Sequence, residues 1–112
     1  MAGRQSYLGE FEQVVLLAVV RLEAEASGTN IRREIEARGG RHVSIGAAYA
    51  TLDRLVDKGY LHTRDASGTA DREGAARRYF SITPEGVVAL ERARSLQARM
   101  WEGIELRRRR KA

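Results

Sequence analysis

A run of seven consecutive apolar residues, Val14 to Val20, most constrains what this chain can fold into. The run is far shorter than the roughly 20 residues that span a bilayer, and the acidic residues Glu10 and Glu12 precede it. We therefore expect neither a membrane helix nor a signal peptide. The run lies inside a stretch of helical length, Leu8 to Glu23, and is apolar on every side of that helix. Because one small domain easily covers only one side of a helix, the run predicts a partner chain.

The composition fits a single globular domain and excludes several kinds of site. With 112 residues, of which 43% are hydrophobic and 31% charged, the chain is long enough for one core and too short for two. The sequence has no cysteine, which excludes disulfides, thiolate zinc sites and cysteine nucleophiles. His42 and His62 fall in different predicted elements, so we expect no metal site, and we expect no cofactor. We expect a cytoplasmic protein.

The net charge of +5 is unevenly distributed in a way that favours a nucleic-acid partner. Residues 107–111, RRRRK, supply five of the 20 basic residues, and without them 15 basic residues face 15 acidic ones. Residues 28–83 hold ten Lys or Arg against seven Asp or Glu, whereas residues 6–25 hold one against four. We therefore expect positive potential in the middle of the chain and at its basic tail.

Three helices are predicted in the first half of the chain. The stretch 8–23 forms the first, and a break at Ser27-Gly28 separates it from a short amphipathic helix that ends at Gly39-Gly40. Ser44 is a good N-cap for the third helix, which stops at Lys58-Gly59. Apolar residues of this third helix recur at spacings of three, four and three, which predicts a buried stripe made of Ile45, Ala48, Leu52 and Leu55.

Two strands and a last helix are predicted to follow. β-branched and aromatic residues predict strands over 60–64 and 77–83, joined by a polar, glycine-containing loop at 65–76. Thr83 as N-cap, with Pro84 at the first helical position, predicts a helix long enough to project from the domain. Apolar residues run along this helix at spacings of three to four, with a polar step at Gln97, and comprise Val87, Leu90, Ala93, Met100 and Ile104.

The order of helix, helix, helix and hairpin is that of a winged helix-turn-helix, whose second helix of the pair lies in the major groove of DNA. The predicted fold class is therefore mainly α with a β-hairpin wing. Four segments make the interpretation sharper, and on them the chain resembles the PadR-like transcriptional regulators over residues 8 to 90. The segments are LGEFEQVVLLAVVRL at 8–22, GTNIRREIE at 28–36, SIGAAYATLDRLVDKGYL at 44–61 and RRYFSITPEG at 77–86.

The resemblance implies a ligand-responsive repressor of the short type, which has a single helix after the wing. In such relatives the last helix packs on the first helix of the other subunit, which implies a homodimer and a palindromic operator with half-sites about 34 Å apart. The division is then a DNA-binding domain at 1–83, a dimerisation helix at 84–106 and a basic, disordered tail at 107–112. Ser27-Gly28 stands where many members carry Tyr-Gly, and Gly74-Ala75-Ala76 stands before Arg77 where Gly-Gly-Arg is common.

Several residues are candidates for contact with double-stranded DNA. If the buried stripe faces inward, the open side of the third helix carries small residues and Tyr49, whose hydroxyl can reach a phosphate. The alternative is that Tyr49 fills the core and that Arg54 pairs with Asp57 or a nearby Glu. Arg77 and Arg78 are adjacent on a strand, so only one of them is expected to face DNA. The candidates are Ser44, Ala47, Tyr49, Thr51, Arg54, Arg72, Arg77, Arg78 and Arg32. Helix capping, helix surface, solvent and a mixed-charge face are the ordinary roles left open for the others.

Trp101 is the only tryptophan and lies one turn beyond Gln97 on the last helix. Short relatives bring aromatic residues of this helix together across the dimer to stack planar drug-like molecules, so the resemblance implies a planar aromatic effector bound at Trp101 and Gln97. The alternative is an interface or surface tryptophan.

No paired carboxylates, nucleophile–base pair or phosphate-binding glycine loop is visible, so we expect no enzyme activity. The other class left open is a winged-helix protein-interaction module without DNA binding.

Overall fold

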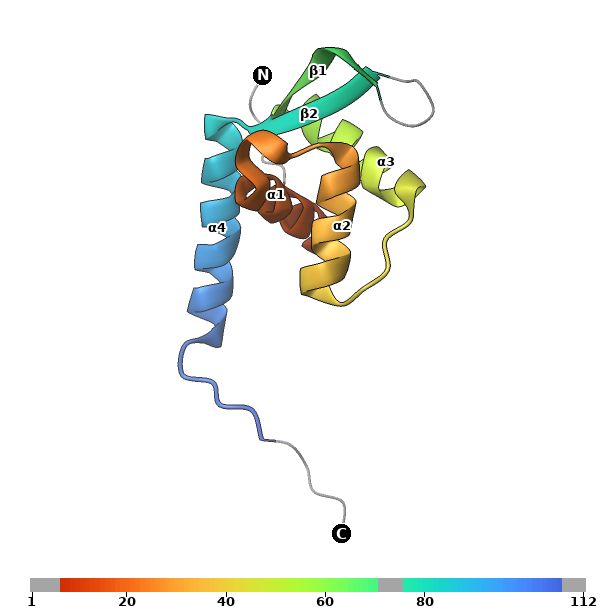
Figure 1. The fold of residues 1–112 in the computed structure, drawn as a ribbon. Coiled ribbons are helices and arrows are strands. Elements are labelled where there is room, and N and C mark those ends of the chain that lie inside the picture. The colour runs from red at the N-terminus through yellow and green to blue at the C-terminus, as the bar shows by residue number, and fades with distance from the viewer. Residues whose placement is uncertain (1–6, 71–75, 108–112) are drawn as a thin grey trace.

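The computed structural model describes residues 7–70 and 76–107, and Figure 1 shows their arrangement. The elements are α1 (Glu10–Leu22), the short 3-10 helix η1 (Glu23–Glu25), α2 (Gly28–Gly39), α3 (Ile45–Asp57), the antiparallel strands β1 (Leu61–Ala70) and β2 (Ala76–Ile82), and α4 (Pro84–Trp101). This is a winged helix-turn-helix followed by one helix, mainly α with a β-hairpin, and the predicted fold class is confirmed.

Side-chain caps set where the helices begin. The hydroxyl oxygen of Ser44 accepts a hydrogen bond from Ala47 N at 3.1 Å, and that of Thr83 accepts one from Gly86 N at 2.9 Å. Ser27 caps α2 in the same way through Asn30 N at 3.2 Å. Such caps are worth about 1 kcal/mol each, because they satisfy N–H groups that the helix leaves without partners.

The core lies where α1, α2, α3 and the base of the hairpin meet. Its fully or nearly fully buried apolar side chains include Val15, Leu16 and Val19 of α1, Ile31 and Ile35 of α2, Ala48, Leu52 and Leu55 of α3, and Leu61 and Phe80 of the hairpin. The segment between α1 and α2 joins β2 as well, because Phe80 N donates to the Ala26 carbonyl at 2.9 Å. The hairpin is thereby fixed to the helices at its base.

The hairpin is longer than its sequence predicts. Residues 65–70, expected in a polar loop, continue β1 as far as Ala70, which pairs with Ala76. The register runs regularly from Leu61 opposite Ile82 to Asp65 opposite Arg78 and shifts between Asp65 and Ala70. The expectation was wrong because the bonds of a strand ladder are made by the backbone and do not require β-branched side chains.

α4 begins tightly against the hairpin and then leaves the body (Figure 1). A Cβ on Gly86 would lie 2.7 Å from Ile82 Cγ1 and would overlap the Tyr60 carbonyl, so only glycine allows this approach. The helix ends at Trp101, whereas the sequence predicts a helix through Ile104 and a dimerisation helix to residue 106. The chain leaves the helix at Glu102, whose ψ of 127° is extended, and Gly103 follows with a φ of 79°, which is incompatible with a right-handed helix.

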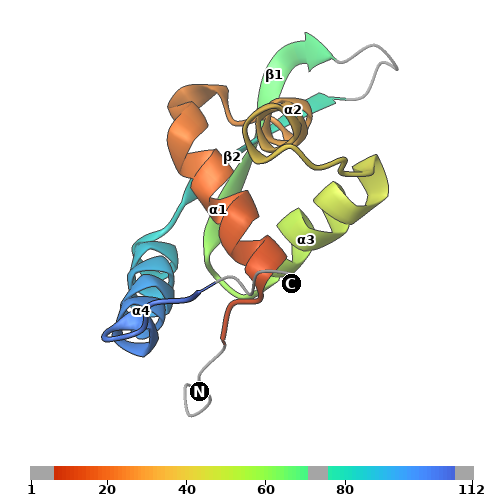
Figure 2. The ribbon, with the colours of Figure 1, turned by 90° about the horizontal axis from the view of Figure 1, so that it is seen from below.

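α3 and α4 lie on opposite sides of α1, as Figure 2 shows. α1 buries Val15 and Val19 in the core, but it leaves Leu17 51% and Val20 45% exposed. The chain therefore covers one side of its apolar helix and leaves the other open, as the run from residue 14 to residue 20 predicts.

Candidate nucleic-acid interface

In a winged helix-turn-helix the second helix of the pair meets DNA with its outer side, and α3 has that position in this chain. In this chain Ala48, Leu52 and Leu55 turn that helix into the core, as predicted. Ile45 was assigned to the same buried stripe, and this is wrong, because it is 61% exposed. Periodicity places Ile45 on the correct side of the helix, but it is the first residue of α3, where the helix begins at the edge of the body (Figure 1).

Thr51 is not available to DNA. Its side chain is buried, with 3% of the residue exposed, and its hydroxyl oxygen accepts a hydrogen bond from Arg54 Nη2 at 3.3 Å. Thr51 lies between Ala48 and Leu55 along the inward side of the helix, so the expectation of a DNA contact is corrected. By contrast, Ser44, Ala47 and Ala50 are exposed. Ser44 is at the same time the N-cap.

Tyr49 packs partly against the protein's own core and does not point wholly outward. The residue is half-buried against the core, and a Cβ on Gly28 would overlap its ring. The ring thus fills the space between α3 and the start of α2. Packing is the role that the structure gives Tyr49, and contact of its hydroxyl with phosphate stays a prediction.

Glu12 of α1 ties the beginning of that helix to α3. Its carboxylate is 9% exposed and accepts hydrogen bonds from Gly9 N at 2.8 Å, Arg54 Nε at 3.1 Å and Lys58 Nζ at 2.8 Å. Burial raises the pKa of Glu12, but the hydrogen bonds from Lys58, Gly9 and Arg54 outweigh it and hold the pKa below its usual range. Arg54 therefore has an ion-pair partner, as its alternative interpretation expects, although the partner is 42 residues away in sequence.

Basic side chains of α2 and of the following loop are also paired. Arg32 Nη1 lies 3.4 Å from Glu36 Oε1, and Arg41 Nη1 lies 3.0 Å from Glu10 Oε2. Glu36 also accepts a hydrogen bond from Val43 N at 3.0 Å, which is the main cause of its lowered pKa. The mixed-charge interpretation of Arg32 matches this geometry, and its contact with phosphate stays a prediction.

The two arginines of the wing point to opposite faces of β2, as strand geometry requires. Arg78 lies over the Phe80 ring, with Nη1 3.4 Å from Asp53 Oδ1 on α3. Arg77 is half-buried and has no ion pair with any residue that the structure describes. On the face of Arg77, Arg64 lies over the Tyr79 ring at 4.9 Å. Arg72, the remaining candidate of the wing, lies outside the described residues.

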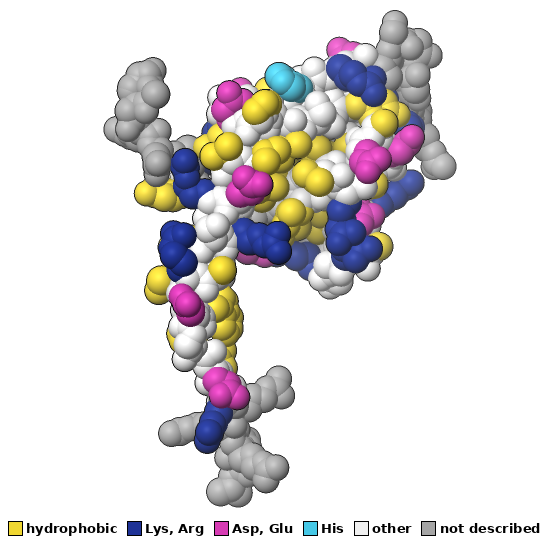
Figure 3. Space-filling view, turned by 90° about the vertical axis from the view of Figure 1, so that its left-hand side faces the viewer, with side chains coloured by type: hydrophobic (Ala, Val, Ile, Leu, Met, Phe, Trp, Pro, Cys, Tyr) yellow, Lys and Arg dark blue, Asp and Glu magenta, His cyan; other side chains and the backbone are white. Residues whose placement is uncertain are grey.

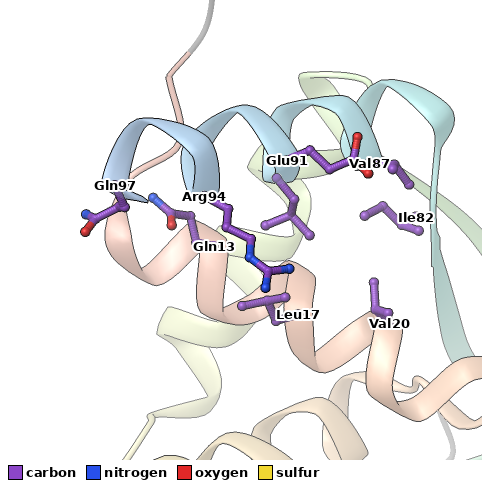
Figure 4. A pocket seen from close by; sticks show the side chains of 9 residues that line it. Gln13, Leu17, Val20, Ile82, Val87, Glu91, Arg94 and Gln97 are labelled. Atoms are coloured by element: carbon purple, nitrogen blue, oxygen red, sulfur yellow. The ribbon is translucent and has the colours of Figure 1, made fainter. Parts of the chain in front are cut away.

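A second surface is apolar and lies on the α4 side of α1. Figure 4 shows a pocket in which Leu17 and Val20 of α1 face Val87 of α4 and Ile82 of β2. Gln97 lines this pocket and also a groove at the end of α4 formed with Leu96, Met100, Trp101, Ile104 and Leu106. Trp101 is 50% exposed there. The two predicted effector residues are thus brought together on one groove.

Other kinds of site find no support in the described ranges. No group of three or more His, Asp or Glu side chains that could hold a metal ion occurs in residues 7–70 and 76–107. Among the same residues, no helix has both the length and the apolar character that crossing a membrane requires.

Known proteins resemble the chain in sequence and in structure. The sequence matches the Transcriptional regulator PadR-like family over residues 16–92, about two thirds of the chain. Among solved structures, RosR of H. salinarum superposes with a TM-score of 0.66 and 26% identity, over 88% of this chain and 81% of that one. No curated protein sequence matches the chain.

Two further structures share the fold at lower identity. A PadR-like transcription factor from Bacteroides fragilis has a TM-score of 0.70 and 21% identity, over 82% of this chain and 84% of that one. A PadR family transcriptional regulator from Eggerthella lenta has a TM-score of 0.65 and 23% identity, over 84% of this chain and 81% of that one. Because the family match extends over residues 16–92, more than half of the chain, the chain belongs to the PadR-like family of transcriptional regulators.

Proposed function

We propose that this family member is a homodimeric repressor that binds palindromic DNA and releases it when a small ligand binds. The observation that carries the proposal is the placement of α3, whose outer side is exposed and lies across α1 from the apolar surface of α4 (Figure 2). In a winged helix-turn-helix this helix enters the major groove and the hairpin reaches beside it. The two surfaces can therefore be occupied at the same time, one by DNA and one by a second subunit.

Three cations on the described parts of α2 and the wing are open to phosphate. Arg33, Arg64 and Arg77 have no carboxylate partner among the described residues of the chain. Arg64 and Arg77 share one face of the wing, where phosphate contacts would position the protein on the duplex. Such contacts release counterions, so the affinity they provide falls steeply with salt.

The apolar surface of α1 and α4 supports a second copy of this chain as the partner. Figure 3 shows hydrophobic side chains on the body beside α4 and along the part of α4 that projects from it. Leu17, Val20, Val88, Leu96 and Met100 are each 45% or more exposed. Leu17 and Val20 line one pocket with Val87 and Ile82, and Leu96 and Met100 line one groove with Trp101. Grouped exposed apolar surface of this kind marks an interaction site. A two-fold axis would bury both helices of each subunit and set the α3 helices about 34 Å apart, one turn of DNA.

The groove at the end of α4 supports ligand release. Trp101 and Met100 offer an aromatic ring and a polarisable side chain to a planar molecule, and Gln97 offers an amide. A ligand there lowers DNA affinity only if it prefers the DNA-free spacing of the two α3 helices. Trp101 emission should quench when planar aromatic compounds bind, and unchanged emission across a varied panel would leave Trp101 structural.

The experiment that tests DNA binding is selection of bound sequences from a random duplex pool, followed by a salt titration with the enriched duplex. We expect an enriched palindrome with half-sites one turn apart. Arg77→Ala should reduce the magnitude of the salt slope by about one per subunit. Arg38→Ala, with the same change of charge near the end of α2, where Arg38 already pairs with Glu34, is the control. Repression follows if transcription from a promoter containing the selected site falls when the protein is added.

A protein-interaction module is the second candidate, and one observation favours it. Many of the basic residues of the winged helix are already neutralised by carboxylates, namely Arg32, Arg38, Arg41, Arg54, Lys58 and Arg78. The apolar Ile45 is also exposed at the start of α3. No enriched duplex, together with partner binding that is insensitive to salt, would support this function in place of DNA binding.

A further inference from the structure

The outward side of α3 offers a partner almost no hydrogen-bonding side chain in its first two turns. Three exposed residues lie there, Gly46, Ala47 and Ala50, and a fourth, Ile45, is exposed at the first position of the helix, at the edge of the body. All four lack a polar side chain. The polar residues of the same turns are engaged elsewhere, because Tyr49 packs on Gly28 and Thr51 is buried. This part of the helix therefore presents only apolar groups and backbone.

The next turn does not change this. Arg54, the cation of α3 that could form a fork with guanine, is held by the carboxylate of Glu12 at 3.1 Å. Asp53 faces the wing and pairs with Arg78 at 3.4 Å. On the described outer side of α3, therefore, no unpaired Arg, Asn or Gln side chain is present to make the usual bidentate contact with a purine.

Gly46 shows that space is kept open on this surface. A Cβ at Gly46 would meet no atom of the chain within 4 Å, so packing of the chain does not require glycine there. Glycine is less favourable than alanine by up to about 1 kcal/mol in a helix interior, and Gly46, the second residue of α3, has part of that cost. The missing side chain therefore benefits a partner that approaches from outside, next to the exposed Ile45.

The major groove contains one apolar group that suits such a surface. Each base-pair edge presents hydrogen-bond donors and acceptors there, and thymine adds its C5 methyl group. The small residues of α3 let the helix backbone come close to the bases. The wing also carries Arg64 and Arg77, which have no carboxylate partner among the described residues and can contact phosphate, which favours DNA as the occupant.

We propose that α3 reads thymine methyl groups, with Ile45 as the main apolar contact and Gly46, Ala47 and Ala50 as the surface that permits close approach. This inference rests on the proposed DNA binding and adds which base the helix selects. Specificity would then come from methyl contacts and from DNA shape, and only weakly from side-chain hydrogen bonds.

The test replaces thymine by deoxyuridine, one position at a time, in the duplex selected by the wild-type protein. The replacement removes one methyl group and keeps every hydrogen-bonding group of the base pair. We expect at least one position in each half-site where affinity falls about fourfold, and about 15-fold when both half-sites are changed, from about 0.8 kcal/mol for each buried methyl-sized group. No loss at any thymine would overturn the proposal.

Two variants identify the side chains involved. In Ile45→Ala the penalty for deoxyuridine should disappear at one position of each half-site and persist elsewhere. Gly46→Ala should raise the resistance to urea while weakening DNA binding, because the added methyl group occupies the space meant for the base edges. Gly39→Ala is the matched control, since its Cβ makes only an ordinary contact at 3.9 Å with Ile35 and should not change DNA affinity.

The failures are distinguishable. If no duplex binds in a salt-dependent way, the proposed DNA-binding function fails before the base readout is reached. If a duplex binds and deoxyuridine has no effect, or if Ile45→Ala leaves every penalty unchanged, the methyl readout is refuted while DNA binding stands. The deoxyuridine series uses the wild-type protein, so its result does not depend on the folding of a variant.

Discussion

Replacing Glu12 by glutamine should destabilise the protein by an amount that the structure allows to be estimated. The carboxylate accepts three hydrogen bonds, from Gly9 N, Arg54 Nε and Lys58 Nζ, at 2.8, 3.1 and 2.8 Å. Hydrogen bonds to a charged group are worth about 1.5–3 kcal/mol each, and breaking a fully buried pair costs about 3–5 kcal/mol. The side chains of Lys58 and Arg54 are 23% and 53% exposed, so water can replace part of what they lose. Glutamine also keeps one acceptor oxygen. We therefore expect the free energy of unfolding to fall by about 1.5–2.5 kcal/mol.

The matched control is Glu10→Gln, two residues earlier on the same helix. Both changes alter the net charge by one unit, but Glu10 is 71% exposed and forms a surface ion pair with Arg41. Exposed pairs of this kind contribute about 0–1 kcal/mol. Urea unfolding at pH 7 and one fixed protein concentration measures both variants, since the stability of the proposed dimer would depend on concentration. Equal losses for the two variants, within about 0.5 kcal/mol, would refute the view that Glu12 fastens α3 to α1.

The same carboxylate predicts a dependence on pH. The pKa of Glu12 is lowered in the folded state, so the unfolded chain binds more protons as the solution becomes acidic. Stability from Glu12 is complete above the ordinary glutamate pKa of about 4.3 and is lost as pH falls through the lower folded pKa. The difference in stability between the wild type and Glu12→Gln should therefore shrink below about pH 4. A difference that stays constant down to the pH of acid unfolding would contradict the assigned ion pairs.

Three further changes test the packing, the dimer and the ligand groove. Gly86→Ala forces a Cβ against the Tyr60 carbonyl and should lower the free energy of unfolding by about 2–3 kcal/mol in urea, and a neutral result would show that α4 can shift at its start. Val20→Glu places a charge on the open side of α1 and should yield a folded monomer in light scattering with lost affinity for a palindrome, whereas an intact dimer would exclude this surface as the interface. Trp101→Phe should keep DNA binding and weaken release by planar aromatic compounds, and unchanged release would place the effector elsewhere.

The helices were predictable because their signals are local. Ser44, Thr83 and Pro84 specify helix starts through bonds or dihedral angles within four residues, and glycine at Gly40 specifies an end through its positive φ. The exposed position of Ile45 was not predictable in this way. Periodicity determines the side of a helix on which a residue lies, but it does not say how far the neighbouring elements extend to cover that side.

The pairing of Glu12 could not be predicted from local sequence. Its partners Arg54 and Lys58 are 42 and 46 residues away and reach it only after α1 and α3 pack together. The spacing of four between the two cations, on one face of α3, was a usable signal, because a carboxylate on the facing helix would be attracted to both. A search for such pairs of cations opposite a lone acid near a helix start would have found this site.

In the proposed dimer, the position of α1 would let a ligand control DNA binding without changing the winged helix internally. Glu12 and the buried Val15 and Val19 hold α3 on one side of α1, while Leu17 and Val20 face α4 on the other. Because α3 is fastened to α1 by packing and by ion pairs, the two helices should move as one body. A ligand at the end of α4 would then act at the joint between subunits and change the distance between the two α3 helices. Loosening this body through Glu12→Gln should lower DNA affinity more than it lowers dimer affinity. A larger loss of DNA affinity than of dimer affinity would indicate that the winged helix moves as a rigid body relative to the dimer interface. The opposite order would indicate that the winged helix itself deforms.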